Sequence, residues 1–280
     1  MLLGQIRFDG ATVAAIFEDG AARPIPLHTM NDLINRADAE MIPLSTLASQ
    51  LATSLKATAT PLIPISPVEA WACGCTYETS SSFRDGEHGT VQGMYSYVYR
   101  EPRPEIFFKG TSRVCVGPGQ NIGIRADSKF TAPEPELALI LGRRGKIHGY
   151  TIANDVSAWD IERENALYLP QSKVYTACLS LGPVILTADA VEDPYKLDMT
   201  CEILRGGKVT FFGTTSTAKL HRKFEELVDY LTRSNAVPAG SVVCTGTGII
   251  VTEENALQPG DVVRIRVPQI GELANTAAAV

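Results

Sequence analysis

The sequence predicts an α+β protein built mainly from mixed β-strands. Short apolar runs of strand length recur from Trp71 almost to the end of the chain, with one clear amphipathic helical pattern among them. The 280 residues are enough for one large domain and one small domain. A proline-bearing stretch, ATPLIPISPVEA, separates two regions of different pattern. We therefore predict a small N-terminal α/β domain over residues 1–63 and a larger β-rich domain over residues 64–280.

The predicted N-terminal domain combines a strand meander with two short helices. Apolar and polar residues alternate over the first 25 or so residues, and Asp-Gly pairs stand at 9–10 and 19–20. Asp-Gly between alternating segments is typical of a hairpin turn. Residues 27–40 and 44–55 then carry apolar residues at helical spacing.

The larger region is predicted to be rich in strands. One amphipathic helix carries Leu220, Phe224, Leu227, Val228 and Leu231, and Arg233, Asn235 and Pro238 mark its end. Residues 199–213 form a predicted hairpin that turns on Gly206-Gly207. The remaining predicted strands are IFFKG (106–110), ELALILG (136–142), GYTIAN (149–154), GPVILT (182–187), VVCTGTGIIV (242–251) and GDVVRIRV (260–267).

A stretch of different character covers residues 78–101, before the first of these core strands. It is rich in Ser, Gly and Tyr and is predicted to be a long polar loop. Loops of this length are uncommon inside compact domains and are usually functional lids or disordered segments. From the residues alone, a mobile lid and a plain surface loop are both open interpretations of this stretch.

Composition narrows the class of protein. The net charge of −6 argues against a nucleic-acid or anionic-membrane partner. No apolar stretch approaches the roughly 18 residues needed to span a bilayer, and the start lacks the features of a signal peptide. The six cysteines are scattered through apolar segments, which favours a reducing cytoplasm over a disulfide framework. We expect a homodimer or homotetramer, and the sequence does not choose between them.

Three carboxylates form the candidate metal site. Glu134 and Glu136 stand two residues apart at the start of an apolar run, so in a strand both point to the same face. Pro135 between them places this stretch at a strand start or a sheet edge. Asp155 closes a second apolar segment and would complete an all-oxygen site. Hard oxygen ligands favour Mg²⁺, or Mn²⁺, over zinc, whereas two solvated strand-end glutamates are the plain alternative.

The order of motifs resembles the fumarylacetoacetate hydrolase family. EPELALILG, GYTIANDVSAWDIE, a following lysine, LGPVILT and CTGTG occur in the family's order and spacing, from about Val68 to about Val267. The resemblance implies a rolled, mixed β fold of the β-sandwich type and a closing lid over the metal. It also implies three kinds of site residue: metal ligands at Glu134, Glu136 and Asp155, a lysine beside the substrate at Lys173, and substrate contacts at Tyr77 and Thr247.

Such a site suits an α-keto acid as the substrate. A dication can chelate the carboxylate and the 2-keto oxygen, and as a Lewis acid it makes the carbon-3 hydrogens acidic. Lys173 could remove one of them if burial and the cation lower its pKa. The family's hydrolases pair the tyrosine with a histidine shortly after it, which helps to activate water. Here Tyr77 is followed by Glu-Thr-Ser, and only His88, in the predicted lid, could substitute.

A dehydration needs no activated water, only a base and an acid for the leaving hydroxyl. Glu105 and Glu162 could supply that acid, and Glu162 stands where family hydrolases carry Gln. The motifs are most similar to the branch of the family that dehydrates 2-keto-3-deoxy sugar acids of the D-arabinonate type. That branch implies a magnesium-dependent hydro-lyase of sugar-acid catabolism with 2,5-dioxopentanoate as its product. The alternatives are an acylpyruvate hydrolase or oxaloacetate decarboxylase on the same fold and, least favoured, a non-catalytic acid-binding protein.

Overall fold

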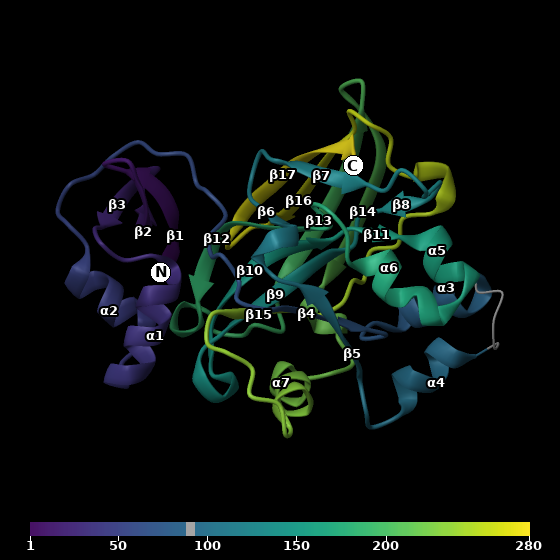
Figure 1. The fold of residues 1–280 in the computed structure, drawn as a ribbon, viewed down its shortest axis with the longest axis horizontal. Helices are drawn as coiled ribbons and strands as arrows, with labels where there is room; N and C mark the ends of the chain where they lie inside the picture. The colour runs from purple at the N-terminus through teal and green to yellow at the C-terminus, as the bar shows by residue number, and fades with distance from the viewer. Residues whose placement is uncertain (88–92) are drawn as a thin grey trace.

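Two mixed sheets form the framework of the computed structural model, which describes residues 1–87 and 93–280 (Figure 1). The larger sheet has the order β3 (Ala21–Ile25), β2 (Ala11–Glu18), β1 (Leu2–Phe8), β12 (Leu179–Thr187), β10 (Ile147–Asp155), β9 (Pro135–Leu141), β15 (Ser241–Cys244), β4 (Ala70–Gly74) and β5 (Glu105–Gly110), with β6 (Cys115–Val116) beside β12. The smaller sheet has the order β14 (Lys208–Ser216), β13 (Asp198–Arg205), β16 (Val262–Val267), β17 (Gly271–Ala279) and β7 (Asn121–Ile124). A short ladder joins β8 (Thr131–Ala132) to β11 (Ser157–Ala158). The predicted α+β class with a mixed β fold is confirmed.

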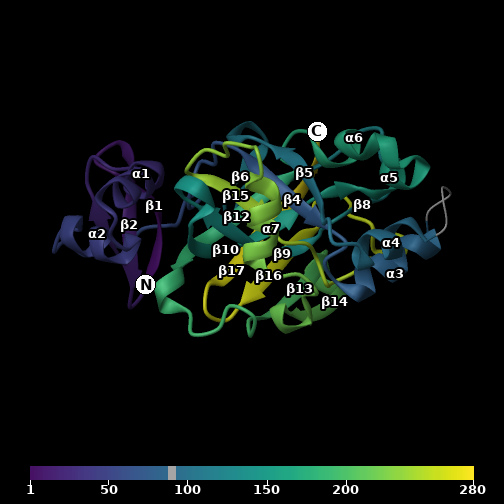
Figure 2. The same cartoon turned by 90° about the horizontal axis from the view of Figure 1, so that it is seen from below.

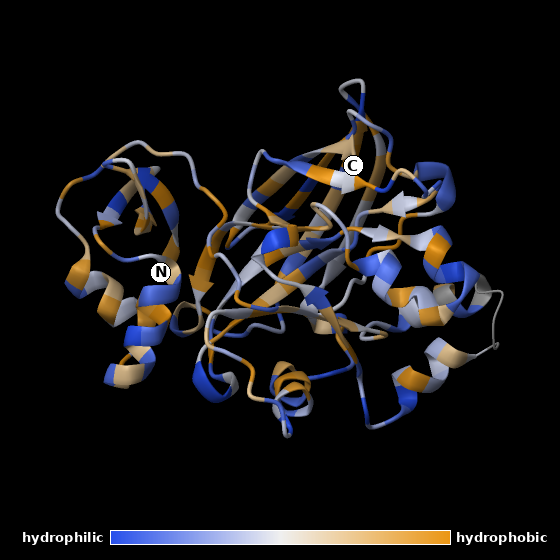
Figure 3. Ribbon diagram, in the orientation of Figure 1, coloured by the Kyte–Doolittle hydropathy of each residue, from blue (hydrophilic) through white to orange (hydrophobic). Residues whose placement is uncertain are grey.

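The core lies on both faces of the larger sheet, as strand β9 shows. Leu137, Leu139 and Leu141 pack in the cluster shared with the smaller sheet. Ala138 and Ile140 point to the opposite face and pack in a second cluster with helices α1 (Met30–Glu40) and α2 (Leu44–Leu51). Burial of both faces explains why this strand is almost continuously apolar. Figure 3 shows the apolar residues concentrated along the interior strands and on α7 (Phe224–Thr232).

The N-terminal elements form the predicted meander and helices. Strands β1, β2 and β3 are joined by tight turns at the two Asp-Gly pairs. Thr29 caps α1, because its hydroxyl accepts a hydrogen bond from the Asp32 N–H while the Asp32 carboxylate accepts one from the Thr29 N–H. Helix α2 ends at Leu51, before the predicted end at 55. Strand β1 pairs with β12, so this unit extends the larger sheet (Figure 2). The boundary near residue 63 stays a prediction.

A buried acid and histidine link α1 to the larger sheet. His148 Nε2 lies 2.8 Å from Asp38 Oδ1, and the Arg143 N–H donates to Asp38 Oδ2 at 2.6 Å. Burial lowers the pKa of His148 below its ordinary value and outweighs the opposing effect of Asp38. Burial therefore favours the neutral imidazole, although the contact with Asp38 favours the charged form.

Two predicted elements in the C-terminal half need correction. Helix α7 begins at Phe224, so Leu220 lies before it, although Phe224, Leu227, Val228 and Leu231 are buried as expected. The strand predicted over residues 242–251 ends at Cys244, because the glycines that follow lead the chain into a turn beside β9. The hairpin of β13 and β14 turns on Gly206-Gly207 as predicted.

The predicted polar loop over residues 78–101 is largely helical. Helices α3 (Glu78–Glu87) and α4 (Met94–Arg100) flank residues 88–92. The Asp85 carboxylate accepts hydrogen bonds from the N–H groups of Tyr95 and Ser96 at 2.9 and 3.0 Å, which satisfies the first turn of α4. This tertiary cap stabilises α4, whose Tyr- and Val-bearing sequence has only a modest helix propensity. His88 lies outside the described residues, and movement of these helices as a lid stays a prediction.

Helices α3 and α4 lie at the same end of the molecule as α5 (Trp159–Glu164) and α6 (Leu169–Lys173) (Figures 1 and 2). The rings of Phe83 on α3 and Trp159 on α5 are 5.7 Å apart. No helix in the described part of the chain is long and apolar enough to cross a membrane.

Candidate metal and active site

The three predicted metal ligands meet at one end of strands β9 and β10. Glu134 directly precedes β9, Glu136 is its second residue and Asp155 ends β10. The antiparallel register pairs Ala153 with Glu136, which carries Asp155 across from Glu134. All three carboxylates are buried, and one oxygen from each lies within 4.8 Å of the others. Pro135 marks a strand start rather than a sheet edge, since β9 lies between β10 and β15.

Neighbouring donors hold the oxygens of the two glutamates. Trp159 Nε1 donates to Glu134 Oε1 at 2.7 Å, and Lys173 Nζ donates to Glu134 Oε2 at 2.8 Å. The Gly246 N–H donates to Glu136 Oε2 at 2.6 Å. Charge-assisted bonds of this kind fix both position and rotamer. The carboxylates are therefore held in a defined arrangement.

Lys173 lies in the middle of this cluster. Its side chain is 1 % exposed, and Nζ also donates to Ser157 Oγ at 2.7 Å. The same nitrogen is 3.7 Å from Asp155 Oδ2 and 3.8 Å from Glu162 Oε2. Helix α6 is a short helix with Pro170 near its start, and Lys173 is its last residue.

Sequence reasoning missed a second buried lysine. Lys109, near the end of β5, is fully buried, and its Nζ lies 2.5 Å from Asp155 Oδ1. It also donates to the backbone oxygens of Val156 and Lys173. The only signal in the sequence was a lysine directly after the apolar run IFF, which is equally typical of an exposed strand end.

Electrostatics and donor chemistry both suit a hard dication. Burial raises the pKa of Glu136 well above its ordinary value, and the nearby Asp155 and Glu134 carboxylates raise it further. A cation among the three would remove this repulsion. Burial and the nearby Glu136 also raise the pKa of Cys73 and Cys244, so both thiols stay protonated and are poor ligands. The oxygen-only set fits Mg²⁺ or Mn²⁺.

The predicted substrate contacts, Tyr77 and Thr247, lie beside the cluster. Burial, and then the nearby Glu136, raise the pKa of Tyr77, so its phenol stays protonated. Thr247 follows Gly246, and its hydroxyl accepts from the Ile249 N–H at 3.2 Å and lies 3.1 Å from Ile249 O. Thr247 is thus buried in the turn that supplies the N–H group to Glu136.

The two candidate acids occupy different surroundings. Glu162 on α5 is buried, 3.4 Å from both the Tyr95 hydroxyl and Ser172 Oγ. Glu105 opens β5 and is half-buried, with Cys75 Sγ 3.3 Å from its Oε2. The Glu105 carboxylate lies directly over Gly74, where a Cβ atom would be 2.0 Å from Oε2. Both side chains are therefore restrained, Glu162 next to Lys173 and Glu105 against Gly74 and Cys75.

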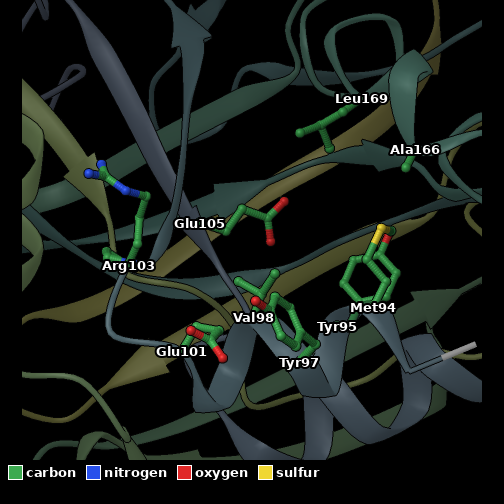
Figure 4. A pocket seen from close by; sticks show the side chains of 10 residues that line it. Met94, Tyr95, Tyr97, Val98, Glu101, Arg103, Glu105, Ala166 and Leu169 are labelled. Atoms are coloured by element: carbon green, nitrogen blue, oxygen red, sulfur yellow. The ribbon is translucent and has the colours of Figure 1, made fainter. Parts of the chain in front are cut away.

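A cavity of about 480 Å³ lies beside Glu105. Its walls are mainly apolar and come from α4, the start of β5 and the segment that carries Ala166 and Leu169. Figure 4 shows the Glu105 carboxylate pointing into this space. The cavity offers room for a small substrate next to a carboxylate.

Comparison with known proteins agrees with this architecture. Residues 87–278 match the family described as fumarylacetoacetate (FAA) hydrolase, C-terminal. The chain is 47 % identical over 213 residues to 2-dehydro-3-deoxy-D-arabinonate dehydratase of Saccharolobus solfataricus, covering 75 % of this chain and 72 % of the relative. It is 46 % identical over 218 residues to a probable 2-keto-3-deoxyxylonate dehydratase of Haloferax volcanii, covering 78 % and 75 %.

Solved structures give the same relationship. A 2-keto-3-deoxy-D-arabinonate dehydratase in complex with magnesium and 2,5-dioxopentanoate superimposes with a TM-score of 0.84 at 36 % identity, covering 100 % of this chain and 99 % of that one. The apo form of that dehydratase gives a TM-score of 0.87 at 35 % identity with the same coverage. The chain therefore belongs to the fumarylacetoacetate hydrolase family.

Proposed function

We propose that this protein is a magnesium-dependent hydro-lyase that converts a 2-keto-3-deoxy-pentonate of the D-arabinonate type to 2,5-dioxopentanoate in sugar-acid catabolism. The buried cluster of Glu134, Glu136 and Asp155, with Lys173 bonded to it, carries the proposal. Two relatives above 45 % identity are described as dehydratases of 2-keto-3-deoxy sugar acids, which supports this reaction over others on the fold. The solved relative that holds magnesium and 2,5-dioxopentanoate supports the metal and the product.

The three carboxylates would hold Mg²⁺, with Mn²⁺ as a possible substitute. The bound ion would supply a Lewis acid for the carboxylate and keto group of a small α-keto acid. Tyr77 and Thr247 would contact the substrate beside the cluster. The apolar cavity next to Glu105 would take the far end of the substrate and limit its contact with water.

In this mechanism Lys173 takes a proton from carbon 3. Its bonds to Glu134 and Ser157 fix the nitrogen, so its approach to the substrate is set before binding. A carboxylic acid then protonates the hydroxyl at carbon 4, the carbon–oxygen bond breaks and water leaves. A double bond forms between carbons 3 and 4. Loss of a proton from carbon 5 and its return at carbon 3 give an enol with its double bond between carbons 4 and 5. Loss of the proton from the carbon-5 hydroxyl and uptake of a proton at carbon 4 then give the aldehyde, so the overall change is loss of one water.

Glu105 is our candidate for the acid that protonates the leaving hydroxyl. It faces the cavity, where the far end of a substrate would lie, whereas Glu162 lies 3.8 Å from Lys173. We propose that Glu162 moves protons next to Lys173 during the rearrangement. A proton donor must reach the atom it serves, and this criterion favours Glu105 for the hydroxyl.

The alternatives have less support. An acylpyruvate hydrolase needs a water-activating histidine, and the sequence after Tyr77 carries Glu-Thr-Ser instead. An oxaloacetate decarboxylase on this fold receives no support from the two relatives above 45 % identity, which are described as dehydratases. A non-catalytic acid-binding protein would have no need for the buried lysine.

We also propose that the protein works in the cytoplasm as a homodimer or homotetramer. The six cysteines are free thiols, as a reducing compartment would keep them. The apolar side chains of Val209 and Phe212 on β14 are more than half exposed, which suits contact with a second copy. Sedimentation of the purified protein would measure the number of subunits.

A panel of α-keto acids, assayed with Mg²⁺ and followed by NMR identification of the product, tests the reaction. We expect 2,5-dioxopentanoate from a 2-keto-3-deoxy-pentonate, no activity after EDTA treatment and recovery with Mg²⁺ or Mn²⁺. Acylpyruvate should be a poor substrate. Full turnover in metal-free protein, or rapid cleavage of acylpyruvate, would disprove this function.

A further inference from the structure

Lys109 is a buried cation whose ammonium group contacts both the metal site and the backbone of the proposed base. Nζ lies 2.5 Å from Asp155 Oδ1 and donates to Val156 O at 3.1 Å and Lys173 O at 2.5 Å. Two of these contacts are hydrogen bonds to backbone oxygens, and the contact with Asp155 is an ion pair. The side chain is fully buried, so these contacts lie in a low-dielectric interior.

In the metal-free site, Lys109 lies beside three carboxylates that repel one another. Glu134, Glu136 and Asp155 lie close together in a buried site, where like charges repel strongly. Lys173 forms an ion pair with Glu134 at 2.8 Å, and Lys109 forms one with Asp155 at 2.5 Å. Lys109 lies next to Oδ1 of Asp155, whereas Oδ2 of Asp155 is 3.7 Å from Lys173 Nζ. The two lysines therefore lie near different oxygens of the Asp155 carboxylate.

We propose that Lys109 is a positioning residue that serves as the internal counter-cation of the metal-free site. It offsets the charge of Asp155 while the dication is absent and holds this ligand and the Lys173 backbone in place for binding. The inference rests on the metal site of the proposed function. It concerns a residue to which neither the motifs nor the proposed reaction gives a role.

Thermal unfolding of four proteins, each with and without saturating Mg²⁺, tests this idea. They are the parent, Lys109→Met, the double variant Lys109→Met with Asp155→Asn, and Lys219→Met as the control, since Lys219 is exposed. Removing one partner of a buried pair should lower the melting temperature of metal-free Lys109→Met by about 10 °C. Mg²⁺ should restore more than half of the lost melting temperature, because the bound dication would then offset the negative charge of Asp155. Lys219→Met should melt as the parent does.

The double variant separates charge from packing. It lacks both members of the pair, so metal-free protein should regain at least half of the stability that Lys109→Met lost. An equal loss with and without Mg²⁺, or a double variant as unstable as the single one, would overturn the proposal. Lys109→Met that folds only with Mg²⁺ would support it. If neither form of Lys109→Met folds, Lys109→Gln takes its place and the same two comparisons decide.

The role proposed for Lys109 can be tested separately from the proposed function, because the melting temperatures do not depend on catalytic activity. If the parent protein binds no Mg²⁺ in isothermal titration calorimetry, the proposed function fails. The comparison of single and double variants in metal-free protein still shows whether Lys109 offsets the charge of Asp155.

Discussion

Alanine at Gly246 would disturb the candidate metal site from the backbone. Gly246 has a φ of +93°, and its N–H donates to Glu136 Oε2 at 2.6 Å. A Cβ atom there would lie 2.0 Å from Thr76 Oγ1 and 3.0 Å from Cys73 O. Thr76 has little room to move, because it is buried and its hydroxyl donates to Thr245 O at 2.7 Å. The turn must therefore shift away and pull its N–H from Glu136.

Two effects lower the free energy of unfolding of Gly246→Ala. A residue with a Cβ in the left-handed region costs about 1 kcal/mol. Loss of the hydrogen bond to a buried carboxylate costs about 2 kcal/mol more. We expect Gly246→Ala to lower the free energy of unfolding by about 3 kcal/mol. Because Glu136 loses a group that orients it, the Kd for Mg²⁺ should rise by about 10- to 100-fold.

Gly260→Ala is the matched control. Gly260 has a φ of +92°, and a Cβ there would meet nothing within 4 Å. It should therefore lose only about 1 kcal/mol and bind Mg²⁺ as the parent does. Urea denaturation measures the first effect and titration calorimetry the second. If Gly246→Ala were no less stable than Gly260→Ala and bound Mg²⁺ equally well, the role given to this turn would be refuted.

Three further outcomes are expected. Lys173→Met should slow exchange of the substrate's carbon-3 hydrogens with deuterated water by about 10²–10⁴-fold while substrate still binds, and unchanged exchange measured by NMR would place the base elsewhere. Glu105→Gln should lose dehydration activity and keep the carbon-3 exchange. The assignment of the acid would instead pass to Glu162 if Glu105→Gln lost both activities and Glu162→Gln lost dehydration alone. The lowered pKa of His148 means that its contribution to stability is present above pH 6.5 and is lost as the pH falls through its folded-state pKa. His148→Gln should therefore give a shallower fall in urea stability on acidification, and an identical pH slope would contradict this.

The site ligands could be foreseen because their signals are local. The two-residue spacing of Glu134 and Glu136 determines a shared face as soon as the segment is a strand. Asp155 follows from the same reasoning at the end of the next strand. The hairpin at Gly206-Gly207 was equally local, since its turn chemistry is carried by adjacent residues.

The features that the sequence did not predict depend on contacts between residues far apart in the chain. Lys109 is separated by 46 residues from Asp155, and only the pairing of β4 with β5 and the path of α6 bring it to the site. Helix α4 owes its first turn to Asp85, a partner that no periodicity reveals. The strand expected beyond Cys244 gives way to a turn because Gly246 bonds to Glu136, 110 residues earlier. Each miss reflects a tertiary interaction that outweighs local propensity.

The strand order of the larger sheet has a consequence for how the chain is made. Strand β15, at residues 241–244, lies between β9 and β4, which end at residues 141 and 74 and are therefore synthesised at least 100 residues earlier. A ribosome must therefore release about seven-eighths of the chain before the middle of this sheet can close. Pairings of such long sequence separation fold slowly and leave strand edges open in the meantime. The nascent N-terminal half should thus depend on chaperones until its central strand emerges, and expression at low temperature should raise the soluble yield.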